Sequence, residues 1–281
     1  MFFALALAVA VGLLIQSVIT VPVLADSGSS QKAAVRPPAI HAESAIVVDM
    51  DSGQVLYSHD ANTCRRMAST TKIMTALIVL KNMRLDQVVT VSAHAASTPP
   101  QSVGLRAGDR VTVGQLLYGA LVWSGNDAAE ALAEAGGGGS EKAFVAKMNR
   151  MAASLGLTNT HFVNPHGLDA PGQYSTARDL AKLARYAMQN AQFRKIVSTD
   201  SYTIKLPGRE PFVLHNVNKL VRTVDWVTGV KTGSTSQAGY CLVASGTRNG
   251  ERVLSVVLGE PTSDLNWSES KALLEYGFAR N

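Results

Sequence analysis

A serine and a lysine three positions apart, Ser69 and Lys72, form a pair suited to nucleophilic catalysis. Residues i and i+3 share one face of a helix, so the lysine amine can reach the serine hydroxyl one turn away. A buried lysine near a second cation, such as Lys231, has a lowered pKa and can accept the serine proton. A serine at a helix N-terminus also places a backbone N–H beside a developing oxyanion. The pair therefore predicts a serine nucleophile for acyl transfer.

The same Ser-x-x-Lys spacing occurs three times, and only the flanking sequence separates the three copies. Ser29 lies in a Ser/Gly-rich stretch and is interpreted as linker. Ser268 is expected to cap the first turn of a terminal amphipathic helix and to leave Lys271 in water. Only Ser69 precedes a long apolar run, residues 73–80, that is typical of a buried helix. The context therefore favours Ser69 as the nucleophile.

A second polar group, Ser124 and Asn126, lies between two apolar helical segments, residues 116–122 and 128–135. This position predicts a tight turn that presents two short polar side chains. Capping of the following helix is the structural alternative for both residues.

A third group, Lys231, Thr232 and Gly233, follows a strand-like run at residues 226–230 and precedes another at residues 240–245. The lysine and threonine side chains can bind a carboxylate, and the glycine lets a substrate backbone lie close. The edge of a plain hairpin is the alternative. Because all three groups occur in this order and in these settings, we favour a catalytic site over helix caps and a plain hairpin edge.

The three groups form the signature of penicillin-binding proteins and class A β-lactamases. From about residue 43 onwards the chain resembles the D-alanyl-D-alanine carboxypeptidases, the low-molecular-mass penicillin-binding proteins of the S11 peptidase family. The further segments that carry this resemblance are residues 45–49, 53–57, 68–76, 156–160, 166–169, 175–180 and 229–235.

The resemblance implies a serine acyl-enzyme cycle without a cofactor. Lys72 takes the proton of Ser69, which attacks the penultimate D-alanine of a peptidoglycan stem peptide, and backbone N–H groups of Ser69 and Ser234 bind the oxyanion. Ser124 and Asn126 pass a proton to the leaving amine and hold the peptide. Lys231 and Thr232 bind the carboxylate of the terminal D-alanine. The implied substrate-binding residues are Lys231, Thr232, Gly233 and Ser234. β-Lactams are expected as covalent inhibitors.

Three other functions remain open. A D,D-endopeptidase that cleaves peptidoglycan cross-links would share every motif, although residues 166–172 resemble the carboxypeptidase branch more closely. A β-lactamase is disfavoured because no Glu-x-x-Leu-Asn segment lies between Asn126 and Lys231. A non-catalytic wall-binding module would require a broken motif, and all three motifs are intact.

Composition and the N-terminal sequence indicate an exported protein, on the periplasmic or cell-wall side. The chain has 281 residues, of which 46% are hydrophobic and 17% charged, and its net charge of +5 comes without a nucleic-acid motif. Residues 1–25 are predicted to be a signal peptide or N-terminal anchor, residues 26–42 a flexible linker and residues 43–281 the catalytic domain. No Lys or Arg precedes the apolar run, so we expect the true start to lie upstream. The chain ends without the C-terminal amphipathic helix of many relatives, so membrane contact is expected only through an uncleaved N-terminal segment.

Two other features of the sequence invite a ligand assignment. His161 and His166 stand five apart with Pro165 between them, which does not suit a helical ligand pair, and no metal site is predicted. The four glycines at 136–139 are interpreted as a loop. Two free thiols are expected, because one of the two cysteines lies in a buried-looking strand.

The order of the elements predicts an α+β fold, with an antiparallel sheet flanked by helices and a mainly helical subdomain, as in β-lactamases and transpeptidases. Strands are expected at residues 45–50, 54–58, 240–248 and 251–258, the last two joined by a turn at Asn249 and Gly250. The helical half should span residues 69–193, and a helix at 264–279 should cover one face of the sheet. The site is expected at the junction of sheet and helices.

Overall fold

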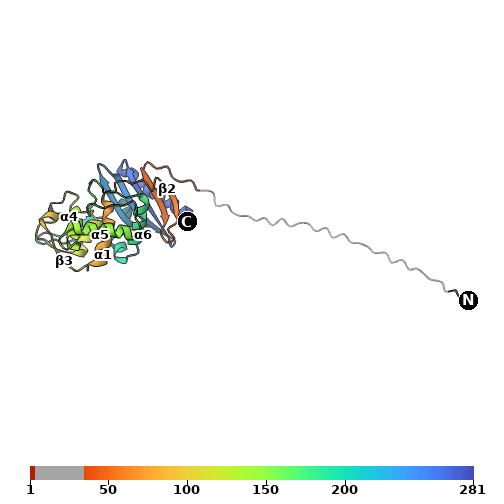
Figure 1. The fold of residues 1–281 in the computed structure, drawn as a ribbon, viewed down its shortest axis with the longest axis horizontal. Coiled ribbons are helices and arrows are strands. Elements are labelled where there is room, and N and C mark those ends of the chain that lie inside the picture. The colour runs from red at the N-terminus through yellow and green to blue at the C-terminus, as the bar shows by residue number, and fades with distance from the viewer. Residues whose placement is uncertain (4–34) are drawn as a thin grey trace. The chain divides into compact units, whose positions relative to one another are not determined.

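The computed structural model describes residues 1–3 and 35–281 of the chain, and residues 35–281 form one compact unit (Figure 1). Residues 4–25 of the predicted signal peptide or anchor, Ser29 and most of the predicted linker lie outside the described residues. None of the helices in the described ranges is both long and apolar enough to span a bilayer. The end of the predicted linker packs on the domain, since Ala42 is buried and His41 donates its backbone N–H to the Glu269 carboxylate at 2.8 Å.

A five-stranded antiparallel sheet forms one half of this unit, with the strand order β2-β1-β9-β8-β7. Its strands are β1 (Ser44–Asp49), β2 (Val55–His59), β7 (Val227–Thr235), β8 (Gly239–Arg248) and β9 (Glu251–Glu260). Both predicted hairpins are confirmed. Asn249 and Gly250 have φ values of 50° and 86°, the left-handed pair that a two-residue turn between twisted strands requires.

Helix α9 (Ser263–Arg280) covers one face of this sheet, as predicted. Its N-cap is Thr262, whose hydroxyl accepts the backbone N–H of Leu265 at 3.3 Å. The predicted capping role of Ser268 is therefore wrong: this residue lies inside the helix, where its hydroxyl donates to the Asp264 carbonyl at 3.0 Å. Lys271 is partly exposed and pairs with Glu275 at 3.3 Å.

The other face of the sheet packs against the helical half of the chain, and Figure 1 shows α1, α4 and α5 grouped together there. The helices of this half are η1 (Ala68–Thr71), α1 (Lys72–Asn82), α2 (Ala93–Ser97), α3 (Val113–Leu121), α4 (Asn126–Gly136), α5 (Glu141–Ser154), α6 (Ala177–Ala187) and α7 (Ala191–Val197). The short helix α8 (Lys219–Thr223) lies on the opposite face, where Leu220 packs in the same core cluster as α9. Two short hairpins complete the helical half, namely β3 (Val88–Thr90) with β4 (Arg110–Thr112) and β5 (Ser201–Ile204) with β6 (Phe212–His215). The glycines at 136–139 end α4 and lead to Ser140, which caps α5.

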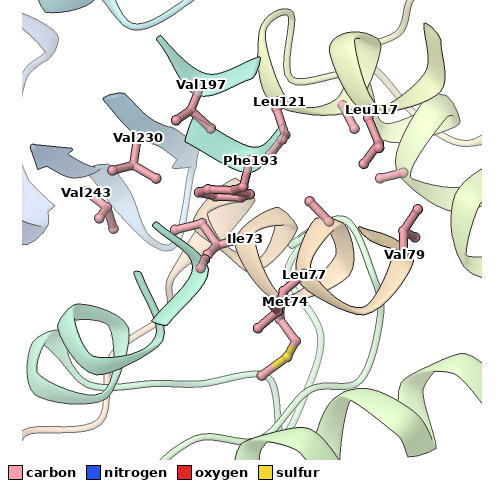
Figure 2. Packing of buried hydrophobic residues seen from close by; sticks show 14 of the residues in the cluster. Ile73, Met74, Leu77, Val79, Leu117, Leu121, Phe193, Val197, Val230 and Val243 are labelled. Carbon is pink, nitrogen blue, oxygen red and sulfur yellow. The ribbon is translucent and has the colours of Figure 1, made fainter. Parts of the chain in front are cut away.

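Helix α1 lies at the centre of the larger hydrophobic core. Figure 2 shows Ile73 and Leu77 of α1 among side chains from α3, α7 and β7, including Leu121, Phe193 and Val230. The burial of residues 73–79 of α1 confirms what the apolar run predicts. Because this helix is fixed by packing on several sides, its first residue, Lys72, is carried into the protein interior.

Candidate active site

Ser69 and Lys72 meet at the start of the central helix. Ser69 lies in the turn η1, and Lys72 is the first residue of α1 and is 0% exposed. The Lys72 amine lies 2.7 Å from the Ser69 hydroxyl, 2.7 Å from the side-chain oxygen of Asn126 and 2.7 Å from the backbone oxygen of His166. The predicted nucleophile and base are therefore in direct contact.

The partners of Lys72 suit a neutral amine. Asn126 Oδ1 and the His166 carbonyl only accept hydrogen bonds, and the Asn126 orientation follows from its Nδ2, which donates to the Pro99 carbonyl at 2.9 Å. A neutral amine can satisfy both acceptors and still accept the Ser69 proton with its lone pair. Burial and the nearby Lys231 charge lower the pKa of Lys72 well below its ordinary value, against a smaller opposing effect of Asp127.

Ser124 and Asn126 belong to the turn between α3 and α4. Ser124 has a φ of 70°, a strained conformation for a residue other than glycine. The N-cap of α4 is Gly125, and within residues 35–281 no side chain caps this helix, which removes the capping alternative. The Lys231 amine donates to Ser124 Oγ at 2.8 Å and to the Thr232 carbonyl at 3.0 Å. Both side chains of the turn thus contact a buried lysine.

Lys231 stands behind Ser124 and is 1% exposed, so its ammonium reaches the cleft through the serine hydroxyl. Burial lowers the pKa of Lys231 to about 7.

The third motif does not follow the end of a strand, as the sequence suggested, but lies within β7, which continues to Thr235. The reason is its pairing with β8, where Lys231 lies opposite Val243 and Thr235 opposite Gly239.

Gly233 is required by the nucleophile turn. A Cβ at this position would lie 2.8 Å from the Ser69 backbone nitrogen and 2.9 Å from Ala68 Cβ. The sequence suggested that this glycine makes room for a substrate backbone, whereas the structure shows that it makes room for η1. The close contact places the backbone of β7 beside the Ser69 N–H, which is the arrangement that an oxyanion-binding pair needs.

A loop at residues 164–169 supports the other side of the nucleophile turn. Gly167 has a φ of 93°, and a Cβ there would lie 2.0 Å from the Ala68 carbonyl oxygen. The Asn164 side chain accepts the Gly167 N–H at 2.7 Å, and Thr75 of α1 donates its hydroxyl to the Pro165 carbonyl at 2.6 Å. These bonds fix the loop whose His166 carbonyl holds the Lys72 amine.

A cleft of about 390 Å³ opens above these residues. Of the eight predicted site residues, Lys72 and Lys231 lie beneath it, and the six that line it are Ser69, Ser124, Asn126, Thr232, Gly233 and Ser234. Sequence reasoning missed other lining residues, among them Gln101 and the α9 residues Asn266 and Trp267. No Asp or Glu lines the cleft in the part of the chain that the structure describes.

Asp127 is a further residue that sequence reasoning missed. It is fully buried at the start of α4, and its carboxylate accepts the backbone N–H groups of Val103 and Leu105, each at 3.0 Å, and the Ser102 hydroxyl at 2.6 Å. It therefore fixes the segment whose Pro99 carbonyl orients Asn126. A carboxylate in the first turn of a helix was the available signal.

Comparison with known proteins agrees with this geometry. The sequence model of the S11 peptidases, described as D-alanyl-D-alanine carboxypeptidase, matches residues 31–262. The chain belongs to the S11 peptidase family. It is 40% identical to the D-alanyl-D-alanine carboxypeptidase of Streptomyces sp. strain K15, over 90% of this chain and 92% of that protein. It is 36% identical to DacB2 of Mycobacterium tuberculosis, over 92% of this chain and 89% of that protein.

Other S11 relatives are longer. The chain is 37% identical to DacF of Bacillus subtilis over 85% of its own length, but this match spans 62% of DacF. Among solved structures, the Streptomyces K15 DD-transpeptidase superposes with a TM-score of 0.83 at 40% identity, over 87% of this chain and 100% of that chain. These similarities confirm the predicted α+β fold and the serine peptidase family.

Proposed function

We propose that this S11 peptidase is a serine-type D-alanyl-D-alanine carboxypeptidase that removes the terminal D-alanine from peptidoglycan stem pentapeptides. The observation that carries the proposal is the 2.7 Å contact between the Ser69 hydroxyl and the buried amine of Lys72 at the base of the cleft. An amine held neutral by burial beside a hydroxyl is the arrangement that activates a serine for attack.

Acylation begins when Lys72 accepts the Ser69 proton and Ser69 Oγ attacks the carbonyl carbon of the penultimate D-alanine. The resulting oxyanion is bound by the backbone N–H groups of Ser69 and Ser234, which lie at the N-terminus of the nucleophile turn and on β7. Asn126, held between Lys72 and Pro99, presents its amide to the peptide. The product of this step is an ester between Ser69 and the shortened peptide.

The leaving amine needs a proton when the peptide bond breaks. Ser124 contacts the Lys231 amine at 2.8 Å and lines the cleft, so it can pass a proton from Lys231 to the departing D-alanine. Thr232 and the β7 backbone bind the carboxylate of that D-alanine, with the charge of Lys231 behind them. Water then attacks the ester: the neutral Lys231 takes the water proton through Ser124, and Lys72 returns its proton to Ser69 Oγ as the shortened stem peptide leaves.

β-Lactams should acylate Ser69 by the same attack and remain bound. The leaving amine of a β-lactam stays attached to the ester and in the way of water, whereas D-alanine departs, so fast hydrolysis of the β-lactam ester requires a further base, and none of the described residues lining the cleft is a carboxylate. This supports a penicillin-binding peptidase over a β-lactamase.

The acyl acceptor distinguishes the related reactions. The structural neighbour from Streptomyces K15 is named a DD-transpeptidase, an enzyme that passes an acyl group to an amine, and its curated relative is named a carboxypeptidase. The Ser69 ester can serve both reactions, and a D,D-endopeptidase differs only in accepting a cross-linked donor. We assign water as the principal acceptor and a pentapeptide as the donor.

The substrate determines where the enzyme acts. Peptidoglycan lies outside the cytoplasmic membrane, so we propose that the protein is exported and works on the periplasmic or cell-wall side. N-terminal sequencing of the mature protein tests this: a start near residue 26 is expected, and an intact cytoplasmic precursor would contradict export.

The proposed reaction is tested with two substrates, a pentapeptide monomer and a cross-linked dimer, whose products are separated by mass. Release of D-alanine from the monomer with the dimer intact is the expected result, and Ser69→Ala should release none. A parallel incubation with an added amine acceptor measures transfer against hydrolysis. Cleavage of the dimer to monomers without free D-alanine would contradict the assignment.

A further inference from the structure

A buried carboxylate outside the cleft has no hydrogen-bond partner. Glu130 of α4 is 0% exposed, and neither of its side-chain oxygens has a partner among the residues that the structure describes. A buried polar group left without partners costs on the order of 1–3 kcal/mol, and more when it is charged. The mechanism proposed above does not use this residue.

The groups that face Glu130 come from three helices. The Nε2 atom of His94 on α2 lies 3.8 Å from Glu130 Oε1 and 3.8 Å from Oε2 of Glu141 on α5. Glu134 follows one turn later on α4, and ligand atoms of His94, Glu130 and Glu134 all lie within 4.8 Å of one another. Three carboxylates thus surround one imidazole, whose side chain is 65% exposed and leaves a route from solvent.

We propose that His94, Glu130, Glu134 and Glu141 form a binding site for a divalent transition metal, with Zn²⁺ as the ion that fits best. An imidazole together with carboxylates is a donor set that zinc accepts. Zinc bonds of about 2.0–2.1 Å in a tetrahedron place neighbouring ligand atoms about 3.3 Å apart. The His94–Glu130 and His94–Glu141 separations of 3.8 Å are about half an ångström wider than that value, and the ligand atoms of His94, Glu130 and Glu134 lie within 4.8 Å of one another, so the side chains must move by up to about 1.5 Å to close around the ion. The cation would supply the counter-charge that the buried Glu130 lacks.

His166 completes the site as a hydrogen-bond donor to a ligand. Its Nδ1 accepts the Leu168 N–H at 3.2 Å, so the proton of the neutral ring lies on Nε2. That Nε2 atom faces Glu130 Oε2 at 3.8 Å, so a side-chain movement of under about 1 Å would let it donate to the carboxylate. Carboxylates that bind metals are commonly oriented in this way. The backbone oxygen of the same residue holds Lys72, so the proposed site lies directly behind the base.

The sequence predicts no metal site, because its closely spaced histidines, His161 and His166, do not suit a helical ligand pair. In the structure His161 is turned elsewhere, with its Nδ1 2.8 Å from the Gly172 carbonyl oxygen. The proposed ligands instead lie on separate helices, and His94 and Glu130 are brought together by the packing of α2 against α4.

The proposal is tested by zinc binding to the full chain after treatment with a chelator. Equilibrium dialysis against ZnCl₂, with bound metal counted by mass spectrometry, should give one zinc per chain, and zinc should raise the Tm. Glu130→Gln and His94→Ala should each weaken zinc binding by about 100-fold or more and abolish the Tm shift. His215→Ala removes another exposed histidine, on β6, and should bind zinc like the unaltered protein.

Glu130→Gln keeps the shape of the side chain and removes the charge, so the metal-free variant should fold at least as stably as the unaltered protein. If a folded Glu130→Gln variant no longer binds zinc, the loss is therefore due to the missing ligand and not to unfolding. The proposal is overturned if the unaltered chain takes up no zinc beyond what His94→Ala takes up, or if Glu130→Gln binds zinc with undiminished affinity. Activity is not the readout, so failure of the proposed peptidase function would leave this test unaffected.

Discussion

Two buried polar clusters lie on opposite sides of His166, and they differ in how their polar atoms are partnered. In the acylation centre the Lys72 amine has three oxygen partners at 2.7 Å, and Lys231 has two within 3.0 Å. In the cluster around Glu130 both carboxylate oxygens lack a partner in the described part of the chain, and the Nε2 atoms of His94 and His166 lie 3.8 Å away.

The difference shows how the protein uses burial for two purposes. In the acylation centre, burial keeps Lys72 neutral while hydrogen bonds offset the cost of removing it from water. Around Glu130, the same burial leaves an uncompensated acid, which is why that cluster is interpreted as an ion site.

Removal of the nucleophile should have the largest effect. Ser69→Ala should abolish covalent labelling by a fluorescent penicillin, because no other hydroxyl within residues 35–281 contacts the Lys72 amine. Ser29→Ala and Ser268→Ala, which alter the two other Ser-x-x-Lys copies, should label like the unaltered protein. Persistent labelling of Ser69→Ala, measured by gel fluorescence, would contradict the mechanism.

Removal of the base should slow acylation without unfolding the protein. Lys72→Met replaces the buried amine by an apolar chain of similar length, and the labelling rate should fall by about 10²–10⁴-fold. The Tm should not fall by more than a few degrees, because the cost of burying the lysine disappears with it. Lys271→Met, at the equivalent position of an exposed copy, is the matched control and should change neither quantity.

A side chain at Gly233 should disturb the nucleophile turn. Gly233→Ala forces a methyl group to within 2.8 Å of the Ser69 nitrogen, so η1 or β7 must shift. Unfolding in urea should show a loss of about 1–3 kcal/mol, and labelling should slow as well. Unchanged stability and labelling would show that the close packing of β7 on η1 is not needed.

Lys231 should make stability depend on pH in a defined direction. Its pKa is about 7 in the folded protein and near its ordinary value of 10.5 in the unfolded chain, so the unfolded state binds more protons between these values. The Lys231 contribution to stability is therefore lost as pH falls from about 10 to about 7 and is constant below. Lys231→Met should gain stability relative to the unaltered protein over that range, as urea unfolding would measure. A difference independent of pH would contradict the lowered pKa.

Features set by neighbouring residues were predictable from the sequence. The turn at Asn249 and Gly250 follows from two residues that accept left-handed backbone, and the burial of α1 follows from its own apolar run. Ser69 and Lys72 meet because three positions along one chain segment bring them together. The order of the three motifs then indicated that the turn with Ser124 and the strand with Lys231 meet at Ser69 and Lys72.

Features set by distant parts of the chain were not predictable. The end of β7 depends on its pairing with β8, and the position of the α9 cap depends on Thr262 rather than on Ser268. The need for glycine at 233 arises from a contact with a turn more than 160 positions earlier. The cluster around Glu130 has no sequence signature, because its groups come from α2, α4 and α5 and meet only when these helices pack.

The most direct test of the central claim is to locate the covalent adduct formed with penicillin. The intact protein is treated with benzylpenicillin and digested, and the modified peptide is identified by mass spectrometry. We expect one acyl group per chain, on the peptide that carries Ser69, and none on peptides that carry Ser124, Ser268 or the exposed thiol of Cys64. An adduct on any of those residues, with Ser69 unmodified, would contradict the assignment of Ser69 as the nucleophile.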